Sequence, residues 1–260
     1  MTASAPSRGG APHVHTTQAE RPDPDAAAAS APVLPELRTV RTPQHPAAEA
    51  VPAARTAGAE EFGPGGWTVV VPLKPAARGK SRLGAAEALV RAIGLDTVAA
   101  ASRASAVARV LVVTADAATA AAVSGWGRVE VVPDAGGGLA AAIAQGAAAA
   151  GAAVPRAALL GDLPALDPRE LDAALAQAGA HERAVVPDAD GTGSTLVTAR
   201  AGIPWAAAFG ADSFARHLAL ACVPLDVPAE AGLRRDVDTV AHLRALGDAV
   251  GPRTRAALTR

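Results

Sequence analysis

The sequence has few of the residues that form disulfides and aromatic clusters, and it lacks long apolar runs. It contains one cysteine, Cys222, no tyrosine, and only 2% aromatic residues among 260. A single cysteine excludes a disulfide framework within the chain, which fits a reducing cytoplasm. No apolar run approaches the ~20 residues of a membrane span, and the N-terminus lacks the pattern of a signal peptide. The net charge of −1 indicates neither nucleic acid nor an anionic membrane as a partner.

The first 65 residues differ in composition from the rest of the chain. Pro, Ala, Ser, Thr and Gly dominate them, and apolar periodicity is absent. Such a segment cannot bury enough apolar surface to offset the entropy of ordering it. Residues 1–65 are therefore predicted to be a disordered Ala/Pro-rich extension, although a translation start placed too far upstream would leave the same pattern. Residues 66–260 are predicted to form the folded domain.

Strand and helix patterns alternate through this domain. β-branched and continuous apolar runs predict strands at 68–73, 110–114, 129–132, 157–160, 184–187, 196–198 and 223–227. Periodicity and capping signals predict helices at 86–104, directly after the second strand, and at 139–150, 168–178, 213–217 and 240–246. The alternation predicts an α/β fold, a three-layer sandwich with a mostly parallel sheet.

One carboxylate follows the most apolar of these strands. The run 157–160 has no polar face, which is typical of a buried central strand, and it ends in Gly161-Asp162. Ligands of open α/β sheets bind at the carboxyl ends of the strands, and an aspartate there commonly holds a divalent metal against phosphate oxygens. Asp162 is therefore a candidate metal ligand, with a helix-cap or turn aspartate as the alternative.

A loop rich in cations follows the first strand and carries Lys74, Arg78, Lys80 and Arg82. A triphosphate carries about four negative charges, and phosphates are bound by Arg forks and Lys point charges. The loop is not a Walker A loop, because Lys74 stands where that motif has its first glycine. We predict that Lys74, Lys80 and Arg82 bind and align a nucleotide triphosphate; a solvated surface loop is the alternative.

A run of three glycines, Gly136, Gly137 and Gly138, precedes the helix predicted at 139–150. Glycines at a helix start let a ligand approach the backbone N–H groups at the positive end of the helix. This pattern predicts a second part of the nucleotide site, although a flexible turn would have the same sequence.

Two more carboxylates, Asp236 and Asp238, lie in the turn Arg-Arg-Asp-Val-Asp-Thr near the end of the chain. Mg²⁺ is usually held by one or two protein carboxylates together with substrate phosphates and water. Asp162 and Asp236 are predicted to share Mg²⁺, with Asp238 in a supporting role. A helix follows the turn, so capping by Asp238 or Thr239 is the alternative for Asp238.

Hydroxyl groups lie beside glycines in two further stretches. The first contains Thr192, Ser194 and Thr195, and the second contains Gly210 and Ser213. Together they predict a site for a small anion, with an N-cap as the alternative role of Ser213. The histidines show no spacing typical of a catalytic triad, so no histidine is assigned a role.

Taken in order, these stretches resemble the CofC/FbiD guanylyltransferases of coenzyme F(420) biosynthesis. The resemblance spans about residues 67–250 and excludes the N-terminal extension. Its most specific part is the Phe-Gly…Ser…His stretch combined with the closing Asp-Val-Asp-Thr turn. The turn after Asp162 is shared more widely among glycosyltransferase-A-like nucleotidyltransferases. The matching segments are 71–74, 80–83, 161–166, 190–195, 209–217 and 232–239.

The resemblance implies that residues 66–260 are a Rossmann-like nucleotidyltransferase domain that transfers GMP from GTP to phosphoenolpyruvate and releases pyrophosphate. The alternative acceptors are 2-phospho-L-lactate and 3-phosphoglycerate. By the same resemblance, Asp162 and Asp236 would hold Mg²⁺, while Gly210, Ser213 and a hydroxyl of the Gly-Thr-Gly-Ser-Thr stretch would bind the acid. Many members have threonine where Ser194 stands, so that contact falls to Ser194 or Thr195.

The partners implied are GTP and a small phosphorylated carboxylic acid, with a homodimer and a downstream transferase of the same pathway as further expectations. Two rival functions remain at this point. One is another nucleotidyltransferase of this fold, which would make a nucleotide sugar or a molybdopterin dinucleotide. The other is a non-catalytic nucleotide-binding protein. The stretch 209–213 suits a small phosphorylated acid, and carboxylates on separate loops favour an enzyme.

Overall fold

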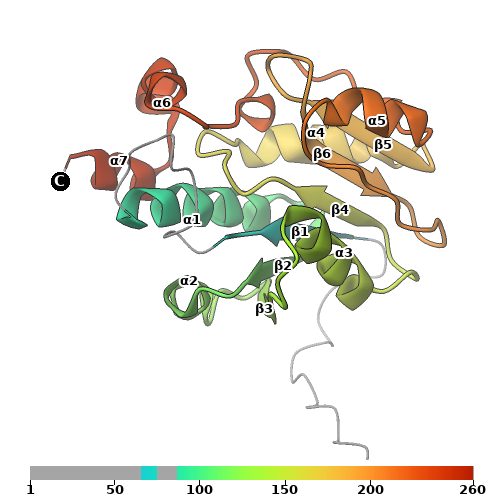
Figure 1. Cartoon of the computed structure of the whole chain (residues 1–260), viewed down its shortest axis with the longest axis horizontal. Helices are drawn as coiled ribbons and strands as arrows, with labels where there is room; N and C mark the ends of the chain where they lie inside the picture. The colour runs from blue at the N-terminus through green and yellow to red at the C-terminus, as the bar shows by residue number, and fades with distance from the viewer. Residues whose placement is uncertain (1–65, 75–86, 260) are drawn as a thin grey trace, which may run out of the picture. The chain divides into compact units, whose positions relative to one another are not determined.

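The computed structural model describes residues 66–74 and 87–259, which all lie within one compact unit, Thr56–Arg260. Lys80, Arg82 and the predicted extension 1–65 lie outside the described residues. The strands are β1 (Trp67–Pro72), β2 (Val107–Thr114), β3 (Val129–Pro133), β4 (Arg156–Leu159), β5 (Arg183–Pro187), β6 (Ser194–Ala199) and β7 (Val223–Pro224). The α-helices are α1 (Glu87–Arg103), α2 (Ala117–Val123), α3 (Leu139–Ala150), α4 (Pro168–Ala178), α5 (Ser213–Ala219), α6 (Val240–Leu246) and α7 (Pro252–Leu258) (Figure 1).

The seven strands form one sheet in the order β3-β2-β1-β4-β6-β5-β7. Every neighbouring pair is parallel except β4–β6 and β5–β6, so β6 alone runs against the others. The mostly parallel sheet predicted from the sequence is confirmed. The reversal of β6 was not predicted, because a short apolar strand carries no signal of its direction.

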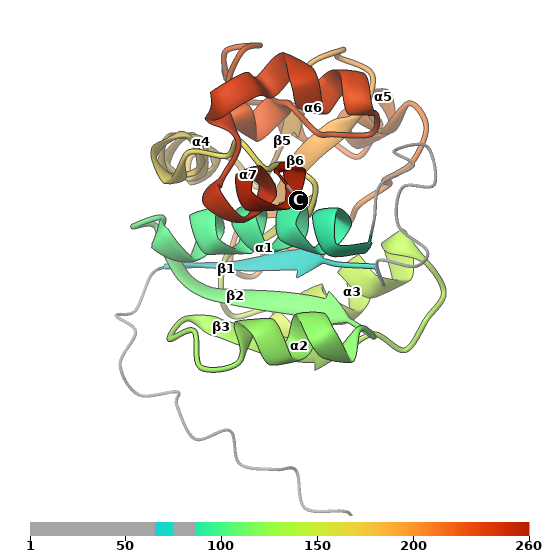
Figure 2. The same cartoon turned by 90° about the vertical axis from the view of Figure 1, so that its left-hand side faces the viewer.

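Helices cover both faces of the sheet, as Figures 1 and 2 show. Val69 and Val71 of β1 point into the main core, to which α1, α2 and α4 contribute, whereas Val70 points to the opposite face and packs with α3. A smaller cluster around Val185 and Val197 lies beneath the α5 region. This alternation along buried strands gives the three-layer sandwich that the sequence predicts.

Helix α7 was not predicted from the sequence, although Gly251-Pro252 is a helix-start signal. It packs on α1 (Figure 2) because the buried carboxylate of Asp96 accepts hydrogen bonds from the N–H groups of Thr254 (2.7 Å) and Arg253 (3.3 Å). The Arg253 side chain also pairs with Asp96 at 3.6 Å. A carboxylate from α1 therefore caps a helix that is distant in sequence, which a local pattern cannot reveal.

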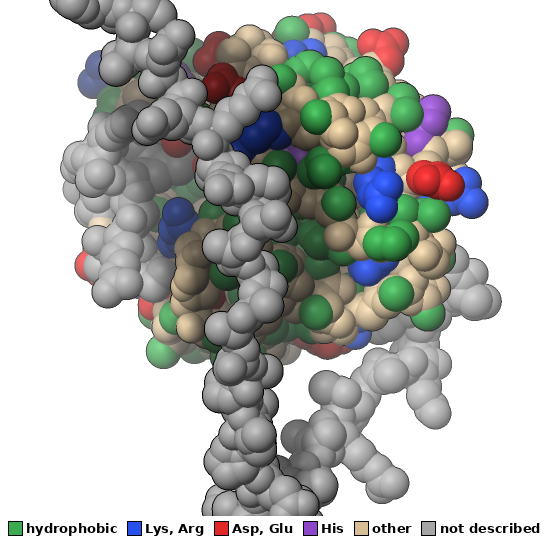
Figure 3. Space-filling view, turned by 45° about the vertical axis from the view of Figure 1, so that its right-hand side comes forward, with side chains coloured by type: hydrophobic (Ala, Val, Ile, Leu, Met, Phe, Trp, Pro, Cys, Tyr) green, Lys and Arg blue, Asp and Glu red, His purple; other side chains and the backbone are tan. Residues whose placement is uncertain are grey.

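Three strands differ in length from the prediction by three residues each. β2 begins at Val107 and β6 spans Ser194–Ala199, so both are longer than expected, whereas β7 covers only Val223–Pro224. Pro224 has no N–H to donate to a sheet and Pro228 follows closely, which limits β7 to an edge position. Among the coloured side chains of the face in Figure 3, Lys and Arg lie apart and form no continuous stripe. No helix in the described part is long and apolar enough to span a membrane.

Candidate active site

The strand order places the candidate residues along one edge of the sheet. β4 lies between β1 and β6, and the antiparallel direction of β6 brings its first residues to the edge where β1 and β4 end. The Leu160 N–H donates to the Thr195 carbonyl at 2.9 Å, which continues the β4–β6 pairing up to this edge. Lys74 therefore follows β1, Asp162 follows β4 and Ser194 begins β6, and these three strands are adjacent in the sheet.

Asp162 lies in the turn directly after β4. The next residue, Leu163, is fully buried, and its N–H donates to the buried hydroxyl of Thr97 on α1 at 3.0 Å. Gly161 packs against the end of β1, where an added Cβ would lie 2.3 Å from a Leu73 methyl group. These contacts fix the backbone on both sides of the carboxylate, so the core sets the position of Asp162.

The loop that carries Asp236 and Asp238 is held beside this turn. The Val237 N–H donates to the Asp162 carbonyl at 3.0 Å, which joins the two loops directly. Upstream, the Glu170 carboxylate of α4 accepts the N–H groups of Gly232 (3.2 Å) and Leu233 (3.0 Å). At Gly232 an added Cβ would lie 2.0 Å from a backbone oxygen, so only glycine fits there.

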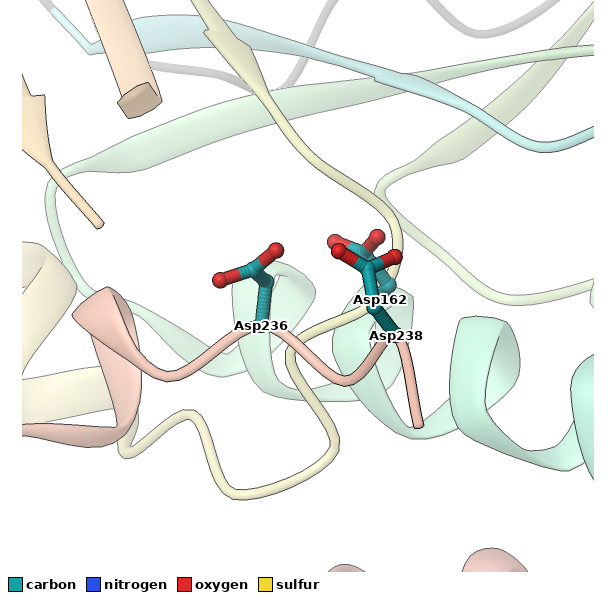
Figure 4. A group of neighbouring side chains, drawn as sticks. All are labelled: Asp162, Asp236 and Asp238. Atoms are coloured by element: carbon teal, nitrogen blue, oxygen red, sulfur yellow. The ribbon is translucent and has the colours of Figure 1, made fainter. Parts of the chain in front are cut away.

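Three carboxylates meet where these loops touch, and we call Asp162, Asp236 and Asp238 the acidic cluster. One carboxylate oxygen from each lies within 4.8 Å of the others. Figure 4 shows Asp162 and Asp238 side by side, with Asp236 approaching from the same loop as Asp238. Asp162 and Asp236 are half-buried and Asp238 is exposed. Oxygen ligands in this number and spacing suit a hard divalent cation.

The helix-cap alternatives for these aspartates are wrong. Thr239 caps α6, since its hydroxyl accepts the His242 N–H at 3.1 Å, and Asp167 caps α4. Asp238 and Asp162 are therefore not the capping residues of the helices that follow them.

A cavity of about 280 Å³ lies between the end of β1 and the start of α3. Lys74, which is exposed, lines it together with Gly136, Gly137 and Gly138. The three glycines have φ between 90° and 92°, a conformation that other residues rarely adopt. The sequence-predicted glycine run and Lys74 thus line one concave site.

Asp134 is a residue of this cavity that the sequence analysis missed. Its carboxylate accepts the Gly136 N–H at 2.8 Å, and Gln145 of α3 bonds the Pro133 carbonyl and the Ala135 N–H. These bonds hold the glycine loop in shape. The Pro-Asp pair at the end of a strand, directly before the glycines, is the signal that could have identified Asp134.

The predicted hydroxyls lie on the other side of β4, and we call Ser194, Thr195 and Ser213 the hydroxyl cluster. Each is at most 3% exposed. A shift of register between β5 and β6 lies where Ser194 pairs with Pro187, and such a bulge re-aims side chains. Thr195 Oγ1 is buried and makes no hydrogen bond among the described residues.

Thr192 and Gly210 lie at the exposed rim of this cluster. Thr192 is in a turn whose N–H groups at Thr192 (3.0 Å) and Gly193 (2.7 Å) donate to the Asp188 carboxylate. Gly210 has φ of 121°, in the region that favours glycine. Asp212, not Ser213, occupies the N-cap of α5, and it makes no side-chain cap bond, so the N-cap alternative for Ser213 is wrong.

Arg234 joins the loop that carries Asp236 to the turn at Asp188, which lies next to the hydroxyl cluster. Its guanidinium donates to the Asp188 carbonyl at 2.8 and 3.1 Å and to the Val227 carbonyl at 3.0 Å. A bidentate contact of this kind fixes the direction of a loop as well as its distance. No role was predicted for Arg234, because the residues it joins are 46 positions apart in the chain.

His217 of α5 is the buried titratable group of this region. The Ala208 N–H donates to Nε2 at 2.8 Å, and Nδ1 lies 3.0 Å from Ser194 Oγ. Burial, and after it the nearby Arg216 charge, lowers the pKa of His217 to about 4, although a hydrogen bond with the Ser213 backbone acts in the opposite direction. The ring is therefore neutral at pH 7. No partner was predicted for His217, since Ser194 lies 23 positions away in the chain.

Comparison with known proteins shows the family to which the chain is similar. Residues 79–228 match the family model of the MobA-like NTP transferase domain. A phosphoenolpyruvate guanylyltransferase of Thermomonospora curvata is 48% identical over 204 residues, which cover 75% of this chain and 89% of that protein. A phosphoenolpyruvate guanylyltransferase of Streptomyces coelicolor is 49% identical, with 75% of this chain and 96% of that protein covered.

Solved structures share the fold at lower identity. Rv0371c of Mycobacterium tuberculosis H37Rv superposes with a TM-score of 0.51 and 22% identity over 71% of this chain and 98% of that chain. A nucleotidyl transferase of Methanothermobacter gives a TM-score of 0.51 and 19% identity over 70% of this chain and 96% of that chain. These likenesses show the nucleotidyltransferase fold.

Proposed function

Because the chain belongs to the MobA-like NTP transferases and to their phosphoenolpyruvate guanylyltransferase family, we propose that it transfers GMP from GTP to phosphoenolpyruvate and releases pyrophosphate. The observation that carries the proposal is the order of groups along the sheet edge. The acidic cluster follows β4, the glycine-lined cavity adjoins β1 on one side, and the hydroxyl cluster begins β6 on the other. That order suits two phosphorylated substrates that meet over carboxylates.

The acidic cluster is the proposed metal site. Its carboxylates come from two loops joined by the hydrogen bond between Val237 and Asp162, and they offer oxygen atoms within 4.8 Å. This donor set fits Mg²⁺, which prefers carboxylate oxygens and retains water and substrate phosphate as its other ligands. When bound, such an ion neutralises the charge on phosphate oxygens and orients them. Asp162 and Asp236 are assigned as ligands and Asp238 as their support.

GTP is proposed to occupy the side of β1. Lys74 and the N–H groups of the Gly136–Gly138 loop line its cavity, and both are donors that phosphate oxygens accept. Lys80 and Arg82 are proposed, on the sequence alone, to add positive charge to the same phosphates. Their proposed role is to bind and align the triphosphate, because the transfer requires alignment and charge neutralisation and no general base.

The acceptor is proposed to lie against Thr192, Gly210 and the hydroxyl cluster. An oxygen of the phosphoenolpyruvate phosphate attacks the α-phosphorus of GTP. A new P–O bond forms, the bond from that phosphorus to the bridging oxygen breaks, and pyrophosphate leaves with the electron pair. The attacking oxygen is already anionic, so no general base is required. Catalysis then rests on alignment and charge neutralisation.

Release of pyrophosphate tests this assignment. Purified protein is incubated with GTP, Mg²⁺ and, in separate reactions, phosphoenolpyruvate, 2-phospho-L-lactate or 3-phosphoglycerate. We expect the fastest release with phosphoenolpyruvate, and little release when ATP replaces GTP. Absence of release with all three acids would refute the proposed function, and a clear preference for another acid would refute the acceptor.

A further inference from the structure

His217 is buried beside the hydroxyl cluster and takes no part in the proposed transfer of GMP. Its side chain is 0% exposed, and its ring meets the ring of Phe209 edge-on, with centroids 4.9 Å apart at 71°. Burying an imidazole costs free energy unless its polar atoms are satisfied. Both ring nitrogens of His217 therefore need hydrogen-bond partners, and both have them.

The contacts of the ring assign its tautomer. The Ala208 backbone N–H can only donate, so Nε2 must be the acceptor of that 2.8 Å bond. In a neutral imidazole the other nitrogen, Nδ1, then carries the hydrogen. Nδ1–H therefore donates to Ser194 Oγ at 3.0 Å and shares its hydrogen with the Ser213 backbone. Both nitrogens are thus bonded and Phe209 packs against the ring, which fixes its orientation.

This bond determines what Ser194 can do. A serine hydroxyl has one O–H donor and two acceptor lone pairs. Because Ser194 Oγ accepts from His217, its own hydrogen is left to donate elsewhere, and no other hydrogen bond of this oxygen is found among the described residues. The hydroxyl is thus prepared as a donor, and the ligand it suits is an oxygen with negative charge.

We propose that His217 is a positioning residue, which orients the Ser194 hydroxyl so that it donates to an anionic oxygen of the phosphorylated acid. The proposal rests on the proposed function, since it concerns the acceptor side of the same site. His217 itself does not touch the substrate. Its contribution is to prevent the Ser194 O–H from turning inward, which would remove a donor from the acid and leave GTP binding unchanged.

Two substitutions of His217 separate positioning from packing. In His217→Asn the amide nitrogen can replace Nδ1–H, whereas in His217→Gln the longer side chain can satisfy Ala208 but not Ser194. We expect His217→Gln to raise the KM for phosphoenolpyruvate about tenfold, the loss of one hydrogen bond to a charged group. We expect His217→Asn to keep that KM within about threefold of wild type, and the KM for GTP to stay unchanged in both.

A double-mutant cycle with Ser194→Ala tests whether His217 changes the KM for phosphoenolpyruvate through Ser194. If His217 acts through Ser194, then His217→Gln adds little to the KM for phosphoenolpyruvate once the hydroxyl is gone. Multiplicative effects of the two changes would overturn the proposal, as would equal KM values for His217→Gln and His217→Asn. Should His217→Gln fail to fold, Ser194→Ala alone decides, because an unchanged KM for phosphoenolpyruvate would contradict the donor role of Ser194.

Failure of this inference is distinct from failure of the proposed function. If wild type releases no pyrophosphate from GTP with phosphoenolpyruvate, the function itself is wrong. If wild type is active and the variants follow either of the contradicting patterns, only the role of His217 is wrong. Thermal melts of each variant accompany the kinetics, so that a loss of fold is not read as a change in KM.

Discussion

The acidic cluster and the hydroxyl cluster lie on the same edge of the sheet but are constructed in opposite ways. The acidic cluster is negatively charged, half-buried or exposed, and is positioned by backbone bonds between loops. The hydroxyl cluster is uncharged and at most 3% exposed, and a neutral histidine bonds the hydroxyl of one member, Ser194. The neighbouring strands β4 and β6 thus lead to two different sites, one charged and accessible and the other neutral and buried.

The difference suits the ligand proposed for each site. Carboxylates that remain near water keep their charge without a large desolvation cost and stay available to a cation. A buried hydroxyl that is paired, as that of Ser194 is with His217, costs little free energy and discriminates between ligands by direction rather than by charge. We therefore expect changes in the acidic cluster to affect turnover and changes in the hydroxyl cluster to affect the affinity for the acceptor.

The largest effect is expected from Asp162→Asn. The amide keeps the shape of the side chain but removes the charge that holds a divalent cation, so kcat should fall about a hundredfold or more, a loss of several kcal/mol of stabilisation. The melting temperature should stay close to wild type. Asp236→Asn should behave in the same way, as measured by pyrophosphate release over a range of Mg²⁺ concentrations.

Glu230→Gln is the matched control, because it changes an exposed carboxylate to an amide in the same segment upstream of Asp236. It should leave kcat unchanged. Near wild-type turnover of Asp162→Asn at low Mg²⁺ would mean that the acidic cluster is not the metal site.

A smaller effect is expected from Thr195→Val in the hydroxyl cluster. Valine has the shape of threonine, and the hydroxyl it removes is buried without a partner among the described residues, so stability should be retained or increased. If that hydroxyl meets the acid, the KM for phosphoenolpyruvate should rise about tenfold while kcat changes little.

Thr198→Val provides the contrast on the same strand. The Thr198 hydroxyl is buried but already accepts the Ala184 N–H at 3.1 Å. This variant should lose about 1 kcal/mol of stability and keep its KM. Equal KM values for Thr195→Val and wild type would remove Thr195 from the acceptor site.

Another carboxylate, Asp96, sharpens the comparison because it is 4% exposed and its oxygens accept hydrogen bonds from the start of α7. Its removal in Asp96→Ala leaves the N–H groups of Arg253 and Thr254 without their acceptor. The expected cost is about 1–3 kcal/mol, which lowers the melting temperature by about 3–10 °C. Turnover below the melting range should be unchanged; a selective loss of kcat would show that Asp96 serves the reaction.

The last expected effect is a pH dependence of stability from His217, which leaves turnover at pH 7 untouched. Its folded-state pKa of about 4 lies below the ordinary 6.5, so between these values the unfolded chain binds a proton that the folded chain does not. His217 therefore destabilises the fold progressively as pH falls from 6.5 to 4. The melting temperature of wild type should fall relative to that of His217→Asn over this window. A constant difference between the two would contradict the lowered pKa.

The sequence predicts these two regions unequally well. Asp162 and the glycines at 136–138 follow strands, so local pattern and the rule that ligands bind at strand ends were enough to place them. The bond from His217 to Ser194 and the anchor of Leu163 on Thr97 join residues far apart in the chain. Such contacts depend on strand order and on the reversal of β6, which short apolar runs do not encode. The assignment of the domain to residues 66–260 stays a prediction.

The central claim is transfer of GMP to an acid, and ³¹P NMR of one reaction mixture tests it directly. With GTP, phosphoenolpyruvate, Mg²⁺ and wild-type protein, we predict that the monophosphate resonance of phosphoenolpyruvate disappears. Two coupled diphosphate resonances and pyrophosphate should appear in step with its loss. Formation of pyrophosphate or phosphate while the phosphoenolpyruvate resonance remains intact would show hydrolysis of GTP and contradict the account.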